Sequence, residues 1–167
     1  KIGKLALTEL RIIGTSTLIG ALPTGLNYLF LNGSSIAWTY TGALPTGLTY
    51  FFLNGSSIAW TYTGALPTDL NYLFLSGDLI AWTYTGALPT GLTYLRLAGS
   101  SIAWTGLNVG NDGNITTFIL EDYRTDKMSS PDMVTLLTQL TNRTGSLPAT
   151  ITINEYADYA SPPQAVT

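Results

Sequence analysis

Residue types that commonly carry out catalysis are scarce in this chain. It contains no histidine and no cysteine, and these two residues supply the usual triad members and the imidazole and thiolate ligands of metal sites. A pair of carboxylates about 5 to 10 Å apart could still hydrolyse a glycosidic bond. However, Asp69 and Asp78 lie in a single repeat, and the equivalent positions of the other repeats hold Gly and Ser. We therefore expect no enzymatic activity, no metal site and no cofactor.

The residues that could bind a partner are aromatic, and they recur every 22 residues. They alternate with leucines, so in a β-strand they point away from the leucine side, towards solvent. Neighbouring parallel strands lie about 4.8 Å apart, so equivalent rings would stack in columns. One column is Tyr28, Tyr50, Tyr72 and Tyr94, and the next is Phe30, Phe52, Phe74 and Arg96.

Two interpretations of these columns remain open. The rings could satisfy β-propensity and cover one another without any binding role. A contiguous patch of seven rings should, however, exceed the roughly few hundred Å² of apolar surface that monomers usually expose, which favours an interface. The partner could be another protein, a second copy of the array or a sugar that stacks on tyrosine. The eight residues of the two columns are therefore the candidate binding site.

Four near-identical blocks must form the elements that position these columns. They begin at Gly20, Gly42, Gly64 and Gly86 and share the pattern G-A-L-P-T-x-L-x-Y-x-x-L-x-G-x-x-I-A-W-T. The spacing L-x-x-L-x-L, with an Ile five residues later, resembles the leucine-rich repeat, and the Leu-Pro dipeptide resembles its short bacterial subtype. The resemblance implies a curved solenoid with short parallel β-strands on the concave face and an extended, turn-rich convex side.

Elementary packing arguments favour the same architecture. A short strand cannot bury one apolar edge alone, so the leucines of each coil must pack on those of the next. Proline fixes an extended backbone on the return path and disfavours a helix there. The ninth position of the motif departs from the family, because Ser34, Ser56, Asp78 and Ser100 replace the usual Asn. These side chains make fewer turn bonds, so we expect a looser turn.

The repeat pattern divides the chain into three parts. Residues 1–19 are a degenerate N-terminal repeat, residues 20–105 hold the four repeats, and residues 106–167 are a C-terminal loop, strand and helix-strand cap. The chain is expected to open in a strand at Lys1, with something upstream missing. The degenerate motifs are placed at Ile2, Leu5 and Leu7 before the array and at Ile115, Phe118 and Leu120 after it.

A second aromatic series follows each inward-pointing Ile. We expect each Trp to fold over the edge of the core, where its ring would bury on the order of 150 to 250 Å², and the following Tyr to lie half exposed. The series is Trp38, Trp60, Trp82 and Trp104, with Tyr40, Tyr62 and Tyr84.

The C-terminal part contains signals for loops, a helix and a strand. The Gly/Asn/Asp cluster of residues 110–114 is interpreted as turn chemistry rather than a calcium site. Ser129, Ser130 and Pro131 predict the start of a helix that ends near Asn142, and residues 147–153 predict a strand that covers the open edge of the sheet. The acids are expected to form a solvated edge with the bases; these residues are Glu121, Asp122, Asp126, Arg124 and Lys127.

The tail of residues 161–167 repeats the pattern that begins at Ser130. We therefore expect a second helix to begin there, in a segment of a longer polypeptide. Neutral repeats that lead into helix-strand units are similar to leucine-rich surface and virion proteins of Bacteroidetes-type bacteria and their phages.

Charge and hydropathy exclude some partners. The net charge is −3 with only seven Lys and Arg, which argues against nucleic acid because phosphate binding needs clustered bases. No apolar run of about 18 residues could cross a bilayer, so we expect no membrane insertion. Charged residues make up only 10% of the chain, well below the roughly 25% typical of soluble domains.

These observations favour a structural or adhesive repeat protein that self-assembles or packs on other subunits through neutral aromatic faces. A phage virion protein or a bacterial extracellular fibre would fit, so the expected location is extracellular, on the cell surface or in a virion. The alternative is a recognition module that binds a host protein or glycan on its concave face.

Overall fold

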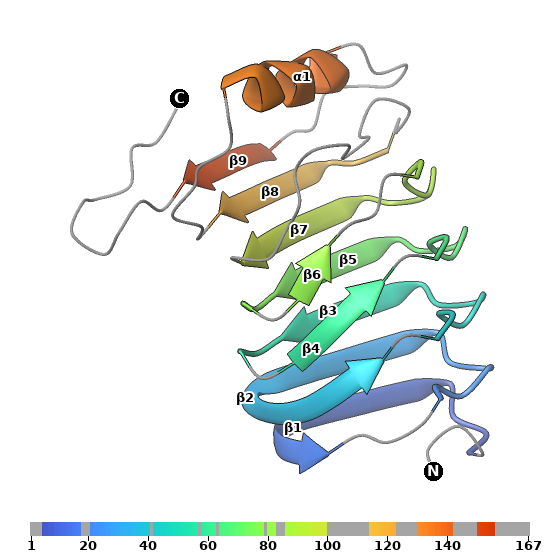
Figure 1. Ribbon diagram of the computed structural model, residues 1–167. Helices are drawn as coiled ribbons and strands as arrows, with labels where there is room; N and C mark the ends of the chain where they lie inside the picture. Colours follow the sequence, from blue (N-terminus) through green and yellow to red (C-terminus); the bar gives the residue numbers. More distant parts are fainter. Residues whose placement is uncertain are drawn as a thin grey trace.

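The computed structural model describes residues 5–17, 21–40, 42–56, 58–62, 64–78, 80–82, 86–99, 114–122, 130–141 and 150–155. In these ranges the chain winds into a β-solenoid whose successive coils lie on one another (Figure 1). The predicted solenoid is therefore confirmed.

The larger sheet, which we call sheet A, receives one strand from each coil, and all its neighbouring strands pair in parallel. The inward and outward side chains alternate along its strands as predicted. Leu29 and Leu31 of the first repeat are fully buried, while Tyr28 and Phe30, which alternate with them, are half-buried on the outer side. The strands are, in spatial order, β1 (Glu9–Thr17), β2 (Tyr28–Tyr40), β3 (Tyr50–Asn54), β5 (Tyr72–Ser76), β7 (Tyr94–Gly99), β8 (Thr117–Asp122) and β9 (Thr150–Glu155).

A second parallel sheet, sheet B, lies across the core from sheet A and was not predicted. It contains the end of β2, β4 (Ile58–Tyr62) and β6 (Ile80–Trp82), and Figure 1 shows β4 and β6 in front of the strands of sheet A. The return path is thus extended as expected, and the Trp-Thr-Tyr segment of one coil pairs with the Ile-Ala-Trp segment of the next. Hydrogen bonding between coils satisfies backbone groups that a solvated loop would leave to water.

The two sheets differ in register. In sheet A, Tyr28 lies opposite Tyr50, so equivalent residues face each other. In sheet B, Trp38 lies opposite Ile58 and Tyr40 opposite Trp60, a stagger of two residues that β4 and β6 repeat. Equal spacing in the sequence therefore does not place Trp opposite Trp. The packing of these indole rings, and the whole of Trp104 and Tyr84, lie outside the described residues.

The core is a continuous column of leucines between the sheets. The leucines of the motif are 0% exposed in all four repeats, and Phe51 takes the place of one of them. The leucine of the Leu-Pro dipeptide is 5 to 6% exposed in the four repeats, and the proline begins a turn in which, for example, the Leu26 amide donates to the Pro23 carbonyl at 3.2 Å. Ile115, Phe118 and Leu120 extend the core as predicted.

The leucine motif of the N-terminal repeat was predicted at the wrong residues. Leu5 is 52% exposed, and β1 begins only at Glu9, with Leu10 opposite Leu29 and Ile12 opposite Leu31. The working motif is therefore Leu7, Leu10 and Ile12, because only this phase continues the core columns of the next coil. The expected strand at Lys1 lies partly outside the described residues, and residues 5–8 are not a strand.

Successive coils come into close backbone contact at the turn between the sheets, and the expected looser ladder of side-chain bonds at its Ser and Asp positions stays a prediction. Backbone groups of successive coils meet there directly: the Gly55 amide donates to the Ser76 carbonyl at 2.9 Å. A Cβ built on Gly33 would lie 2.2 Å from the Gly14 carbonyl oxygen, and one on Gly99 would lie 2.5 Å from that of Gly77. A side chain at Gly33 or Gly99 would collide with the neighbouring coil, so this turn requires glycine at these positions.

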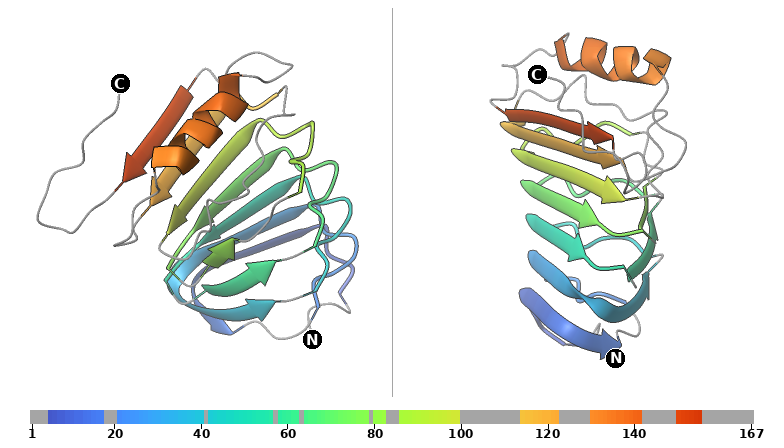
Figure 2. Two further views of the ribbon diagram at one scale, coloured as in Figure 1. Left: turned by 45° about the horizontal axis from the view of Figure 1, so that its top comes forward. Right: turned by 90° about the vertical axis from the view of Figure 1, so that its left-hand side faces the viewer.

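Helix α1 (Ser130–Thr141) lies between β8 and β9 in the sequence. It lies beyond β9 at the end of the stack (Figures 1 and 2), and its Leu136 is buried in the core while Val134 is 62% exposed. Residues 147–149 of the predicted last strand lie outside the described residues; β9 begins at Thr150 and pairs with β8.

Candidate binding face

The tyrosine column forms a regular stack on the outer side of sheet A. The ring centroids of Tyr28, Tyr50, Tyr72 and Tyr94 are 4.3 Å apart at each step, with interplanar angles of 8 to 10°. This follows from the register, which places each ring opposite its equivalent in the next strand. The two inner rings are consequently covered on both faces, and their edges and hydroxyls point outward.

Stacking changes the acidity of the inner hydroxyls. Burial raises the pKa of Tyr72, and the negative charges that Tyr94 and Tyr50 would carry when ionised raise it further. Burial and the charge that Tyr28 would carry similarly raise the pKa of Tyr50 above its ordinary value. These shifts keep the hydroxyls of Tyr50 and Tyr72 neutral at physiological pH.

The phenylalanine column runs beside the tyrosines. Phe30, Phe52 and Phe74 stack with centroid distances of 4.4 and 4.1 Å. The guanidinium of Arg96 lies 4.7 Å above the Phe74 ring, and Phe74 is only 7% exposed. The rings point to the outer side of the sheet as predicted, but they are less exposed than expected, because they and Arg96 cover one another.

Arg96 is held in place by an ion pair with Glu121. Its Nε and Nη2 donate to Glu121 Oε2 at 3.0 and 2.6 Å, and Glu121 is 9% exposed. The expectation that Glu121 forms a solvated edge with Arg124 and Lys127 was wrong. Strand β8 lies beside the strand of Arg96, and Glu121 is its next outward-pointing residue after the one opposite Arg96. Asp126, Arg124 and Lys127 lie outside the described residues.

Arg11 closes the other end of the face, and sequence reasoning missed its role. Its guanidinium lies 5.5 Å from the Tyr28 ring and 5.2 Å from the Phe30 ring, and its Nη1 lies 3.7 Å from Glu9 Oε1. The signal was present in the sequence, because Leu7, Leu10 and Ile12 form an L-x-x-L-x-I motif that puts Arg11 in the column of Phe30. Arg11 was missed because the motif had been placed at Ile2, Leu5 and Leu7.

The structure thus brings together all eight residues named from the sequence and adds Glu9, Arg11 and Glu121. The face consists of two aromatic columns between two arginines, each paired with a carboxylate. Cation–π contacts at both ends contribute about 0.5 to 2 kcal/mol each.

Polar side chains form a third ladder along the edge where the strands of sheet A begin. Thr49 Oγ1 donates to the Asn27 carbonyl at 3.0 Å, and Thr93 Oγ1 bonds Asn71 in the same way at 3.2 Å. These groups satisfy backbone acceptors between coils, so we assign them to the stability of the solenoid.

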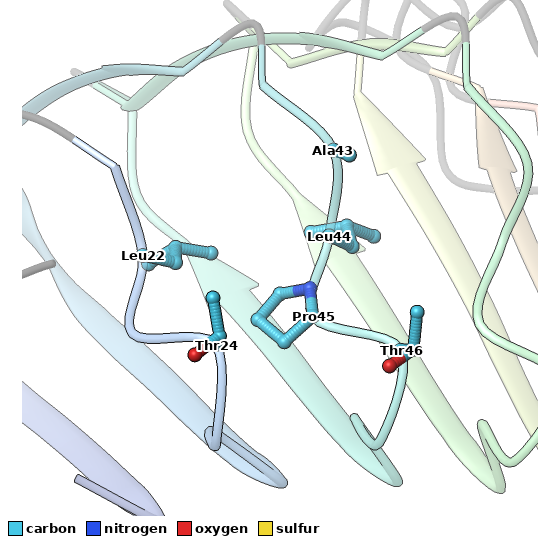
Figure 3. A pocket seen from close by; sticks show the side chains of 6 residues that line it. All are labelled: Leu22, Thr24, Ala43, Leu44, Pro45 and Thr46. Atoms are coloured by element: carbon cyan, nitrogen blue, oxygen red, sulfur yellow. The ribbon is translucent and has the colours of Figure 1, made fainter. Parts of the chain in front are cut away.

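A shallow hollow lies on the return path between two coils. Its volume is about 210 Å³, and Figure 3 shows equivalent residues of two successive coils around it. Its lining contains no ionisable side chain, so it offers nothing that would orient a reacting group. The lining residues are Leu22, Thr24, Ala43, Leu44, Pro45 and Thr46.

Within the described ranges, no three His, Cys, Asp or Glu side chains gather in a group that could hold a metal ion. In the same part of the chain, no helix combines the length and apolarity needed to span a bilayer. Comparisons with protein-family models, curated protein sequences and solved structures find no match. The function must be argued from the aromatic face itself.

Proposed function

We propose that this protein is a non-catalytic structural repeat protein that assembles through the outer face of sheet A. We further propose that the solenoid is of the leucine-rich-repeat type, with sheet A on its concave side, and that α1 and β9 form a helix-strand unit that continues the solenoid. The protein would act outside the cell, on a cell surface or in a virion. One observation carries the assembly proposal: seven aromatic rings form two unbroken, neighbouring stacks on the outer side of a parallel sheet.

The stacking geometry favours a protein partner over a sugar. A sugar that stacks on tyrosine needs an open ring face, but neighbouring rings cover both faces of Tyr50 and Tyr72. The exposed ring edges, which lie in columns at the spacing of the strands, instead match the side-chain rows on the face of a second sheet. Two such sheets pack about 10 Å apart. A module that recognises a host protein or glycan remains the alternative outcome of the test.

Removing two rings tests the proposal. We expect the wild-type chain to self-associate with increasing concentration in analytical ultracentrifugation, and the double substitution Phe30→Ser and Phe52→Ser to weaken association at least tenfold, since about 1.4 kcal/mol lost from the interface changes the dissociation constant by that factor. Phe74 is left intact because it is buried. Val134→Ser is the matched control, since it removes an exposed apolar side chain from α1.

Wild-type protein that stays monomeric at every concentration would overturn the assembly proposal. In that case, surface polysaccharides titrated against tyrosine fluorescence would test the glycan alternative. A fluorescence change that the double substitution abolishes would support that alternative.

A further inference from the structure

The outer face of sheet A has a polarity across its two columns. The first column begins with the carboxylate of Glu9 and continues through the four tyrosines, and the second begins with the guanidinium of Arg11, continues through three phenylalanines and ends at Arg96. Glu9 and Arg11 are each 54% exposed and 3.7 Å apart. One column thus begins with a negative charge and the other with a positive charge, in the same strand.

We infer that this face is the interface of a symmetric dimer whose two-fold axis runs along the solenoid, between the two columns. This inference rests on the proposed function. It adds that the partner is a second copy of the chain and states how the two copies are oriented. The axis reverses the strand direction and keeps each coil opposite the same coil of the partner. Every residue of the first column then faces the partner's residue of the second column.

The charges of the face satisfy this arrangement. Glu9 faces the partner's Arg11, and the symmetry repeats the pair, as an isologous interface requires. Tyr94 faces the partner's Arg96, which presents a cation to an aromatic ring. Between them, each tyrosine faces a phenylalanine, so aromatic edges meet along the whole array.

Two other two-fold arrangements bring like charges together. If the axis ran along the strands through Phe52, Arg11 would face the partner's Arg96, because these residues lie at opposite ends of the same column. If the axis ran along the solenoid on the phenylalanine column, Arg11 would face the partner's Arg11. Like charges across an interface cost several kcal/mol, so the axis between the columns is favoured.

The area of the face is sufficient for a specific but weak dimer. The outer side of all seven strands of sheet A, which includes β8 and β9 beyond the two arginines, measures roughly 550 Å² per copy, or about 1,100 Å² in total, from a strand spacing of about 4.8 Å and five residues of about 3.3 Å. Stable specific interfaces bury about 1,200 to 2,000 Å², so we expect a weak dimer. In Figure 2 (right), the described helix and strands leave this side of sheet A uncovered.

A charge-reversal mixing experiment tests the arrangement. Glu9→Arg places Arg opposite the partner's Arg11, and Arg11→Glu places Glu opposite the partner's Glu9, so each variant alone should dimerise at least tenfold more weakly than wild type. In an equimolar mixture, both cross-pairs become complementary again, and we expect dissociation constants within about threefold of wild type. Both variants keep a net negative charge, since the chain starts at −3 and each substitution changes it by two. General attraction therefore cannot produce the rescue.

Asp69→Arg mixed with Arg11→Glu is the control. It makes the same change in net charge as Glu9→Arg, but Asp69 lies in an exposed turn before β5, so this mixture should show no rescue. Circular dichroism of each variant alone checks that it folds.

A spin label provides a second, independent measurement. The chain has no cysteine, so Thr150→Cys, at the exposed start of β9, accepts a single label. In the proposed dimer each coil faces the same coil of the partner, so the two labels lie within roughly 20 Å of each other. In the dimer with its axis along the strands through Phe52, the two labels are separated by nearly 40 Å.

The outcomes separate this inference from the proposed function. Rescue in the mixture with a short label distance supports the symmetric dimer. If wild type associates and the phenylalanine substitutions weaken it, but the mixture shows no rescue, the two-fold arrangement is wrong and the assembly proposal stands. If wild type does not associate, both are wrong.

Discussion

Arg96 occupies the position that Phe takes in the three preceding repeats, and this single change ends the phenylalanine stack. Its guanidinium covers the Phe74 ring at 4.7 Å. The Arg96 side chain is only 29% exposed, because the side chain of Glu121, itself 11% exposed, lies against it. An arginine placed on a half-buried aromatic surface needs such a partner, since an unpaired charge there would be poorly solvated. The ion pair therefore fixes the end of the aromatic face.

Glu121→Gln should destabilise the fold by about 1 to 3 kcal/mol, because the charge-assisted bonds to Arg96 are lost while the arginine remains partly buried. Urea denaturation followed by circular dichroism measures the change. Glu9→Gln is the matched control: its pair with Arg11 is exposed and should contribute less than about 0.5 kcal/mol. Equal effects of the two substitutions would contradict the structural role assigned to the Arg96–Glu121 pair.

The individual strands show which parts of the fold the sequence could predict. The alternation of Leu29 and Leu31 with Tyr28 and Phe30 was sufficient to orient sheet A, because side chains in a strand point alternately to its two sides. Sheet B was missed because Ile-Ala-Trp-Thr-Tyr carries no period-2 pattern of apolar and polar residues, and pairing between coils depends on their stacking. The pairing of Glu121 with Arg96 was missed for the same reason: it spans a 25-residue separation that no repeat defines.

The turn between the two sheets depends on glycine at the positions where coils touch. Gly99→Ala should destabilise the solenoid by about 1 to 3 kcal/mol, because the residue has φ of +149° and the new Cβ would lie 2.5 Å from the Gly77 carbonyl oxygen. Gly47→Ala is the matched control in a neighbouring turn, where nothing lies within 4 Å of the built Cβ; it should be neutral or stabilise by about 0.4 to 1 kcal/mol. The two variants are compared by thermal unfolding, and a larger loss for Gly47→Ala would disprove the assignment.

At the scale of the whole molecule, the stability of a solenoid is approximately the sum of its coils and of the interfaces between them. Bonds between equivalent residues of neighbouring repeats, such as that from Thr49 to the Asn27 carbonyl, span 22 residues, and sheet A keeps that register from β2 to β7. One repeat is therefore an exchangeable unit. Its removal should leave every remaining contact type in place.

Deletion of residues 42–63 should consequently give a folded, shorter solenoid in which Tyr28 lies opposite the former Tyr72. Its unfolding should show a lower m-value, since m scales with the surface exposed on unfolding, and its self-association should weaken because the aromatic face loses one ring from each column. A deletion one residue longer is the control: it would turn the leucines of the following strand to the outer side, and we expect that chain not to fold. If both deletions unfold alike in urea, the coils are not independent units, and the account of the face as a repeating surface fails with them.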